Sequence, residues 1–149
     1  MTGTVWHTRS GEETEALAAS LLGVAPPAGS PCRVVELRGE LGAGKSTFTR
    51  GALRALGVTG HIKSPSYTLL ETYDPPGVHV VHLDLYRLND PEELEHLGLP
   101  DYHRPGFLWF VEWPERGGGR LPIPDLRFEF SIGLAEHRIE RIEILAPNK

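Results

Sequence analysis

A glycine-rich segment carries the clearest chemical signal in the chain. Residues 39–46 read GELGAGKS, which fits the pattern G-x-x-x-x-G-K-[ST] without a gap. Glycines let the backbone wrap closely and point successive N–H groups inward, so that they form a nest for an anion. Lys45 adds a point charge for the β- and γ-phosphates, and the Ser46 hydroxyl is suited to binding Mg²⁺. The segment therefore predicts a nucleotide-phosphate site.

The alternative is a chance match in a glycine-rich turn. The chain has 17 glycines but only three lysines, Lys45, Lys63 and Lys149, so residue frequencies give roughly 4 chances in 1000 of such a match. The segment also lies between an expected strand and an expected helix, as the motif requires. Lys45 is expected to act in catalysis as well as in binding. The residues predicted to bind the nucleotide are Gly39, Glu40, Leu41, Gly42, Ala43, Gly44, Lys45, Ser46 and Thr47.

Two acids follow apolar runs at points where a strand would end. Residues 80–84 end in Asp84, and residues 107–112 end in Glu112. P-loop NTPases need a carboxylate near Mg²⁺, usually at the end of an apolar strand. An acid that only caps a turn is the alternative for each. These patterns do not decide which of the two acids reaches the metal.

A Ser/Pro-rich segment and the histidines are further candidates. Residues 63–68 contain three serine or threonine hydroxyls and a proline, which fits a switch that senses the γ-phosphate and fits an ordinary turn equally well. The seven histidines are scattered, and we interpret each as structural. His79 and His82 lie three apart on an expected strand, point to opposite faces, and so do not form a metal pair.

The elements that must position these residues follow from periodicity and capping. A capping box at Ser10 opens a helix that Gly23 ends, and a second helix starts near Lys45. A third helix opens at Asp90. Strands are expected at residues 32–37, 67–73, 78–85, 107–111 and 126–132 and around 139–144, with the second and third paired as a hairpin and a possible bulge in the last.

This layout predicts an α/β fold. We expect a single P-loop NTPase-like domain over residues 1–149, with three α/β/α layers, a mixed sheet and antiparallel C-terminal strands. A chain of 149 residues and 16.5 kDa is the size of one ordinary domain.

Composition narrows the class of protein. The formal net charge of −5 argues against a generic basic grip on nucleic acid. Cys32 is the only cysteine, so no intrachain disulfide can form. No apolar run approaches the roughly 20 residues of a membrane span, and no signal peptide is visible. The expectation is a cytoplasmic protein that does not associate with a membrane.

Four segments in this order resemble the bacterial TsaE family, formerly YjeE. They are RGELGAGKST at 38–47, KSPSYTL at 63–69, HLDLYRL at 82–88 with DPEEL at 90–94, and VEWPE at 111–115. The resemblance implies a small ATPase needed for threonylcarbamoyladenosine (t6A) modification of tRNA, at adenosine 37 of ANN-decoding tRNAs. Its cofactors would be ATP and Mg²⁺. Its partners would be TsaD and TsaB, a complex that it resets between turnovers, and tRNA would be met only through that complex.

The resemblance also implies roles for individual residues. Ser46 and Glu112 would bind Mg²⁺, and Asp84 would act in hydrolysis. The switch segment would comprise Ser64, Pro65, Ser66, Tyr67 and Thr68. Ser46 and Ser66 stand where threonine is common in the family, and both keep a hydroxyl.

Two other functions stay open from the sequence. A small-molecule P-loop kinase would close an arginine-rich lid over the phosphates, and only Arg116 and Arg120 in a glycine loop resemble one. A non-hydrolysing module, in which the nucleotide only controls docking, has the same sequence features as a slow ATPase. A GTPase is excluded because the only Asn-Lys pair, Asn148-Lys149, ends the sequence and leaves no N-K-x-D motif.

Overall fold

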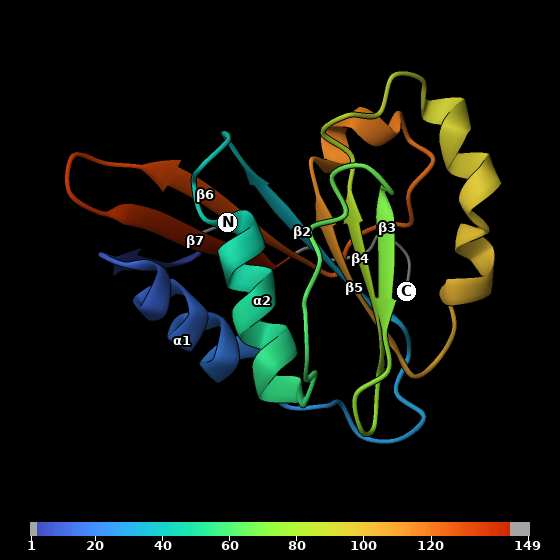
Figure 1. Ribbon diagram of the computed structural model, residues 1–149, viewed down its shortest axis with the longest axis horizontal. Coiled ribbons are helices and arrows are strands. Elements are labelled where there is room, and N and C mark those ends of the chain that lie inside the picture. The colour runs from blue at the N-terminus through green and yellow to red at the C-terminus, as the bar shows by residue number, and fades with distance from the viewer. Residues whose placement is uncertain (1–2, 144–149) are drawn as a thin grey trace.

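A computed structural model describes residues 3–143 as one seven-stranded mixed sheet with helices on both faces (Figure 1). The strand order is β1-β7-β6-β2-β5-β4-β3. The strands are β1 (Thr4–Thr8), β2 (Arg33–Gly39), β3 (Leu70–Tyr73), β4 (His79–Asp84), β5 (Phe107–Glu112), β6 (Leu126–Ile132) and β7 (His137–Glu143). The α-helices are α1 (Gly11–Leu22) and α2 (Lys45–Leu56), and the 3₁₀ helices are η1 (Pro91–Leu97), η2 (Leu99–Tyr102) and η3 (Pro114–Gly117).

The centre of the sheet is parallel and its margins are antiparallel. Strand β2 pairs in parallel with β5 on one side and with β6 on the other, and β5 pairs in parallel with β4. The pairs β3–β4, β6–β7 and β1–β7 are antiparallel. The predicted α/β class, the mixed sheet, the hairpin and the antiparallel C-terminal strand are therefore confirmed.

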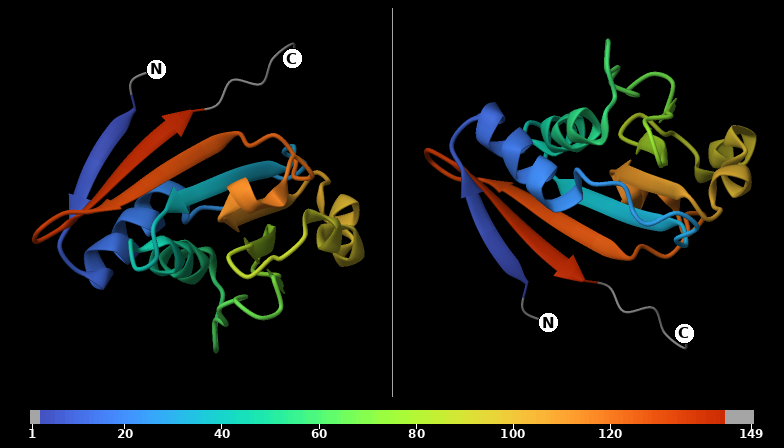
Figure 2. Two further views of the ribbon diagram at one scale, coloured as in Figure 1. Left: turned by 90° about the horizontal axis from the view of Figure 1, so that it is seen from above. Right: turned by 90° about the horizontal axis from the view of Figure 1, so that it is seen from below.

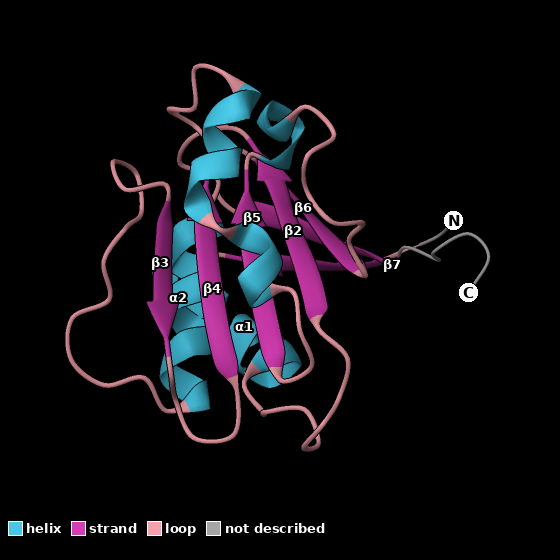
Figure 3. Ribbon diagram, turned by 90° about the vertical axis from the view of Figure 1, so that its right-hand side faces the viewer, coloured by secondary structure: helices cyan, strands magenta, loops and turns pink. Residues whose placement is uncertain are grey.

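Alternate residues of the central strands build two cores. Helices α1 and α2 lie side by side on one face of the sheet (Figure 2). The 3₁₀ helices η1 and η2 lie in front of β4 and β5 in Figure 3, with α1 and α2 behind the sheet. The first core includes Val35, Leu37, Phe48, Phe110 and Phe128. The second includes Val34, Leu83, Leu94, Trp109 and Val111. The three layers are present, with 3₁₀ turns in place of α-helix in the third.

The helix expected after Asp90 is this 3₁₀ segment. Its predicted cap is present, because the Asp90 carboxylate accepts the Glu92 N–H and the Glu93 side chain reaches back to the Asp90 N–H. Gly98 ends the segment in the left-handed conformation. Seven residues between two such stops suit the short 3₁₀ form.

Three strand predictions need correction. Strand β1 was not predicted, and it pairs with β7. Strand β3 begins at Leu70 rather than at 67, because the Leu69 N–H closes a turn onto the Pro65 carbonyl at 2.8 Å and Leu69 has a φ of 67°. The bulge expected in the last strand is absent from β7, which pairs with β6 residue for residue from His137 to Glu143. Ile144 lies outside the described residues.

Within residues 3–143, no helix has the length and apolar character needed to cross a bilayer.

The parallel strands set the position of the functional residues. The segment after β2 leads directly into α2, and β4 and β5 end at the same level, since Asp84 pairs in register with Glu112. Ligands of α/β sheets bind outside the carboxyl ends of such strands. The predicted loop and both predicted acids therefore meet at one edge of the sheet.

Candidate functional site

The glycine loop connects β2 to α2 with a backbone geometry that favours glycine, as Gly39 and Gly44 illustrate. Gly39 has a φ of 149°, and a Cβ there would lie 2.5 Å from the carbonyl oxygen of Phe130 on β6. Gly44 is the N-cap of α2 with a φ of 106°, and no side chain caps the helix. The first N–H groups of α2 are therefore left for a ligand, and an anion is favoured there by the helix dipole.

Lys45 is buried at the start of α2, between the loop and an indole ring. Its ammonium group donates to the carbonyls of Gly39 and Glu40, the latter at 3.4 Å, and lies 4.0 Å from the centroid of the Trp113 ring. Burial lowers its pKa, and the carboxylates of Glu112, Glu115, Asp84 and Glu40 oppose that shift. The four carboxylates therefore favour the charged form of Lys45 beside the loop.

Ser46 and Glu112 are in direct contact, although they are 66 residues apart. The Ser46 hydroxyl donates toward both carboxylate oxygens of Glu112, at 3.1 Å and 3.0 Å. A hydroxyl that gives its proton to a carboxylate keeps its oxygen lone pairs available for a cation. One hydroxyl and one carboxylate are hard oxygen donors, and Mg²⁺ typically binds one or two carboxylates together with substrate phosphates. The two residues therefore fit the ion that the sequence implies.

His82 was missed as a site residue. Its Nε2 lies 2.6 Å from Oε2 of Glu112, and both side chains are 3% exposed. We interpreted this histidine as structural because its spacing from His79 excluded a metal pair. The alternation of side chains along a strand was the available signal, because it places His82 on the same face as Asp84.

Asp84 ends β4 beside Glu112 and is also buried. Its carboxylate accepts the N–H of Tyr86 at 3.1 Å. Burial raises the pKa of Asp84, the charge of Glu112 raises it further, and the Tyr86 N–H, His82 and Lys45 counteract the rise. Within residues 3–143, no cluster of three or more His, Cys, Asp or Glu side chains is arranged to hold a metal. A cation beside these acids would thus need further oxygen ligands, such as phosphates.

The predicted switch segment contributes only part of its length to this region. Ser64 and Ser66 line a cavity of about 290 Å³ together with Lys45, Ser46, Asp84, Glu112 and Trp113. Their hydroxyls are 2.8 Å apart. Pro65 is buried, whereas Tyr67 and Thr68 are exposed. The Arg87 guanidinium lies 4.7 Å from the centre of the Tyr67 ring.

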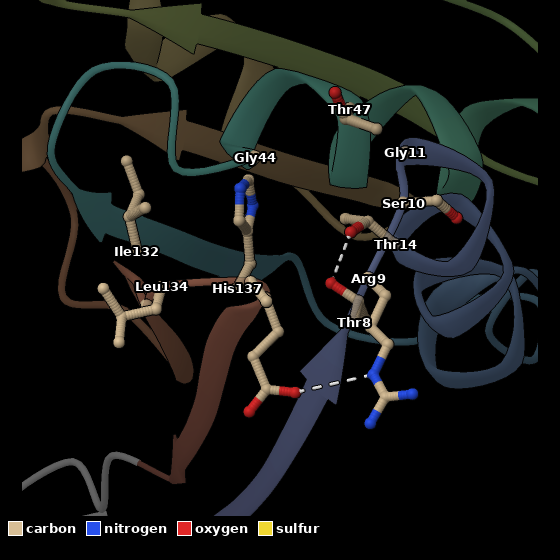
Figure 4. Close-up of a pocket in the computed structure, with 13 residues that line it drawn as sticks. Thr8, Arg9, Ser10, Gly11, Thr14, Gly44, Thr47, Ile132, Leu134 and His137 are labelled. Atoms are coloured by element: carbon tan, nitrogen blue, oxygen red, sulfur yellow. Dashed lines mark hydrogen bonds and ion pairs between the residues drawn. The ribbon is translucent and has the colours of Figure 1, made fainter.

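A second cavity of about 370 Å³ adjoins the first, and Figure 4 shows the residues that line it. The two share Gly44, Thr47 and His137. The second is formed by the corner between β1 and α1 and by the β6–β7 hairpin, at residues 8–11 and 132–137. The His137 ring lies against Gly44, where a Cβ would be 3.3 Å from its Nδ1. No motif predicted this cavity, because only the pairing of β1 with β7 brings its two walls together.

Comparisons with known proteins point to one family. A family model described as "Threonylcarbamoyl adenosine biosynthesis protein TsaE" matches residues 8–141. The "tRNA threonylcarbamoyladenosine biosynthesis protein TsaE" of Haemophilus influenzae is 50% identical over 93 residues, 62% of this chain and 59% of the relative, so the match spans under two thirds of that relative's length. The Bacillus subtilis protein of the same description is 38% identical over 117 residues, 78% of this chain and 70% of the relative. A crystal structure of B. subtilis YdiB superposes with a TM-score of 0.74 at 32% identity, covering 94% of this chain and 84% of that one.

Proposed function

This chain belongs to the TsaE family, and we propose that it binds ATP with Mg²⁺ and hydrolyses it slowly in the t6A modification of tRNA. The observation that carries the proposal is the contact between Ser46 and Glu112 beside the loop lysine. It joins the hydroxyl that follows the lysine of a P-loop to a strand-end acid, in the same cavity as Lys45. Family membership and this pairing both favour a nucleoside triphosphate over other anions.

Phosphate binding is assigned to residues 39–47. The backbone N–H groups of the loop and of the first turn of α2 donate to phosphate oxygens. Lys45 exchanges its contacts with loop carbonyls for contacts with the β- and γ-phosphates, which satisfy an ammonium group better because they are charged. During transfer, the same ammonium group stabilises the charge that develops on the phosphoryl oxygens.

Metal binding is assigned to Ser46 and Glu112. Ser46 would offer its hydroxyl oxygen to the cation while donating its proton to Glu112, and the carboxylate of Glu112 would bind the cation directly or through water. When bound, Mg²⁺ neutralises charge on the phosphate oxygens. Glu112 also fixes the rotamer of Ser46.

Hydrolysis is assigned to Asp84. Its carboxylate lies at the end of the strand next to Glu112 and accepts a backbone N–H from Tyr86, which fixes its direction. A carboxylate in this position can accept a proton from a water molecule and orient it toward the γ-phosphate. Ser64 and Ser66 line the same cavity and suit a switch that responds to that phosphate.

The nucleoside is assigned to the second cavity. This cavity begins at Gly44, the N-cap of α2, where the phosphates would bind. Thr8, Thr14 and His137 also line it. These groups suit the mixed polar and apolar surface of a nucleoside.

The proposed biological role is to reset the TsaB–TsaD complex between rounds of t6A formation. A chain of this size offers few groups that exclude water from its own site, so slow turnover alone and faster turnover with the partners are expected. TsaD and TsaB would also supply the contact with tRNA.

The decisive test is phosphate release by the purified chain, alone and with TsaB–TsaD. We expect Lys45→Ala to lower affinity for a fluorescent ATP analogue at least tenfold and to abolish hydrolysis while the fold persists. Arg54→Ala, an exposed change near the other end of α2, is the matched control. A folded Lys45→Ala protein with normal affinity would contradict the phosphate site. Tight binding without phosphate release, even with the partners, would indicate the non-hydrolysing module instead.

A further inference from the structure

We propose that His82 is a positioning residue for the Mg²⁺ site, whose imidazole holds the Glu112 carboxylate in the orientation that serves the cation. The inference rests on the proposed function, because it requires Glu112 to be a metal ligand. It adds His82 of β4 as a third residue that determines metal affinity, beside Ser46 and Glu112.

Strand register brings the two side chains together. In the parallel β4–β5 pair, His82 lies opposite Phe110 and Asp84 lies opposite Glu112. His82 and Glu112 are therefore diagonal neighbours on the same face of the sheet, the face that α2 covers. The imidazole reaches toward the end of β5 and meets Oε2 of Glu112 at 2.6 Å.

The hydrogen-bond pattern defines the direction of this contact. Ser46 donates to the Glu112 carboxylate from the α2 side, so the carboxylate already acts as an acceptor. The proton between His82 and Glu112 is therefore placed on Nε2, which donates to Oε2.

The other ring nitrogen supports a role directed at Glu112. Nδ1 of His82 is buried and has no hydrogen-bond partner among the described residues. Buried polar atoms are nearly always paired, so an exception calls for an explanation. A histidine retained only to stabilise the core would be expected to use both nitrogens or to be replaced by an apolar residue. The single hydrogen bond of this ring goes to the acid.

Glu112 is consequently held from two sides. Ser46 of α2 and His82 of β4 both bind its carboxylate, and the side chain is 3% exposed. Without His82, the carboxylate would be free to rotate toward the ammonium group of Lys45, whose charge it already senses. Residues that hydrogen-bond to a metal ligand typically contribute 10–100-fold to metal affinity, because they fix the orientation of that ligand.

The test measures how much Mg²⁺ tightens the binding of a fluorescent ADP analogue, as the ratio of its Kd in EDTA to its Kd in Mg²⁺. We expect His82→Phe, which fills the space without a donor, to reduce this ratio about 10–100-fold. Affinity in EDTA should change less than twofold. His82→Gln, whose amide N–H extends to the position of Nε2, should restore most of the ratio. Mn²⁺ affinity in the presence of ADP, measured by electron paramagnetic resonance, should also fall from the wild type to His82→Gln and then to His82→Phe.

Two outcomes would overturn the inference. One is a wild-type ratio in folded His82→Phe, and the other is an equal loss in His82→Phe and His82→Gln, which would indicate packing rather than hydrogen bonding. If His82→Phe does not fold, His82→Asn replaces it, since its shorter amide falls short of Glu112. A ratio in His82→Asn equal to that of His82→Gln then overturns the proposal.

Glu112→Gln, measured in parallel, separates this inference from the proposed function. Loss of the Mg²⁺ response in Glu112→Gln with a normal response in His82→Phe refutes the role of His82 alone. A normal Mg²⁺ response in Glu112→Gln refutes the metal site itself, and the role of His82 with it.

Discussion

Asp84 and Glu112 end neighbouring strands at the same level, but their surroundings differ. The Ser46 hydroxyl and the His82 imidazole both contact the carboxylate of Glu112 and fix its orientation. Asp84 accepts the N–H of Tyr86, and burial together with the charge of Glu112 raises its pKa. A carboxylate with a raised pKa is a better proton acceptor than an ordinary one. The difference between the two environments is the basis for assigning them different roles.

We predict that Asp84→Asn binds ATP within about threefold of the wild-type affinity but hydrolyses it about 100-fold more slowly or worse. The amide keeps the size of the side chain but cannot accept the proton. Rates in a single-turnover assay and affinity for a fluorescent ATP analogue measure the two effects separately. Asp101→Asn, at an exposed position in η2, is the control. Wild-type hydrolysis in Asp84→Asn would make Asp84 a structural acid.

Cys32 should be a poor nucleophile. Burial raises the pKa of its thiol from 9.0 to about 11, and the negative charge of Asp125 adds to the rise. Below that pH the neutral thiol dominates, so at pH 8 the thiolate is about 100-fold scarcer than for an unshifted group. We predict that iodoacetamide alkylates the folded chain at least 100-fold more slowly than the urea-unfolded chain at pH 8. Mass spectrometry measures both alkylation rates. Equal rates would contradict the buried environment of the Cys32 thiol.

At the scale of elements, the packing of α1 against α2 supports the loop that begins α2. Gly51 of α2 lies directly against the backbone of α1, since a Cβ there would be 2.4 Å from the backbone oxygen of Glu15. A backbone atom cannot rotate away as a side chain can. The glycine therefore allows α1 to lie directly against α2.

We predict that Gly51→Ala destabilises the protein by about 1–3 kcal/mol, because the added methyl group separates the helices. The effect should outweigh the gain of about 1 kcal/mol that alanine normally brings to a helix interior. Urea denaturation measures it. Gly11→Ala is the matched control, since its Cβ would meet Thr47 at an ordinary 3.7 Å. Unchanged or increased stability in Gly51→Ala would contradict the close approach.

The elements also show what the sequence could predict. The loop at 39–46 was identified because its residues are consecutive. Strands β4 and β5 were found because buried parallel strands are mostly apolar runs, and β2 was found from its β-branched residues. The contacts of His82 and the second cavity were missed because both depend on strand register. Strand β1 was missed because its residues are mostly exposed and lack a clear apolar alternation. The alternation along β4 gives the face on which His82 lies, but neither strand alone gives the register that brings it to Glu112.

At the scale of the whole molecule, charge argues against tRNA binding by the chain alone. The formal net charge is −5. On the face of the sheet opposite α1 and α2, arginines of β2, β6 and β7 pair with acids: Arg38 and Arg127 each lie 3.3 Å from Glu36, and Arg138 lies 3.2 Å from Glu140. Basic side chains that are already paired release few counterions when they meet a phosphate backbone.

We therefore predict that the isolated chain binds tRNA with a Kd weaker than about 10 µM at physiological salt, with or without ATP and Mg²⁺. A gel shift with labelled tRNA measures this, and TsaB–TsaD alone and with the chain are the comparison. The acidic chain should join a tRNA complex only through its partners, so any shift attributable to it should require TsaB–TsaD. Submicromolar binding by the isolated chain would contradict the charge argument. In that case the paired arginines are the first residues to test, since Arg38→Glu and Arg138→Glu would then weaken binding and reduce its dependence on salt.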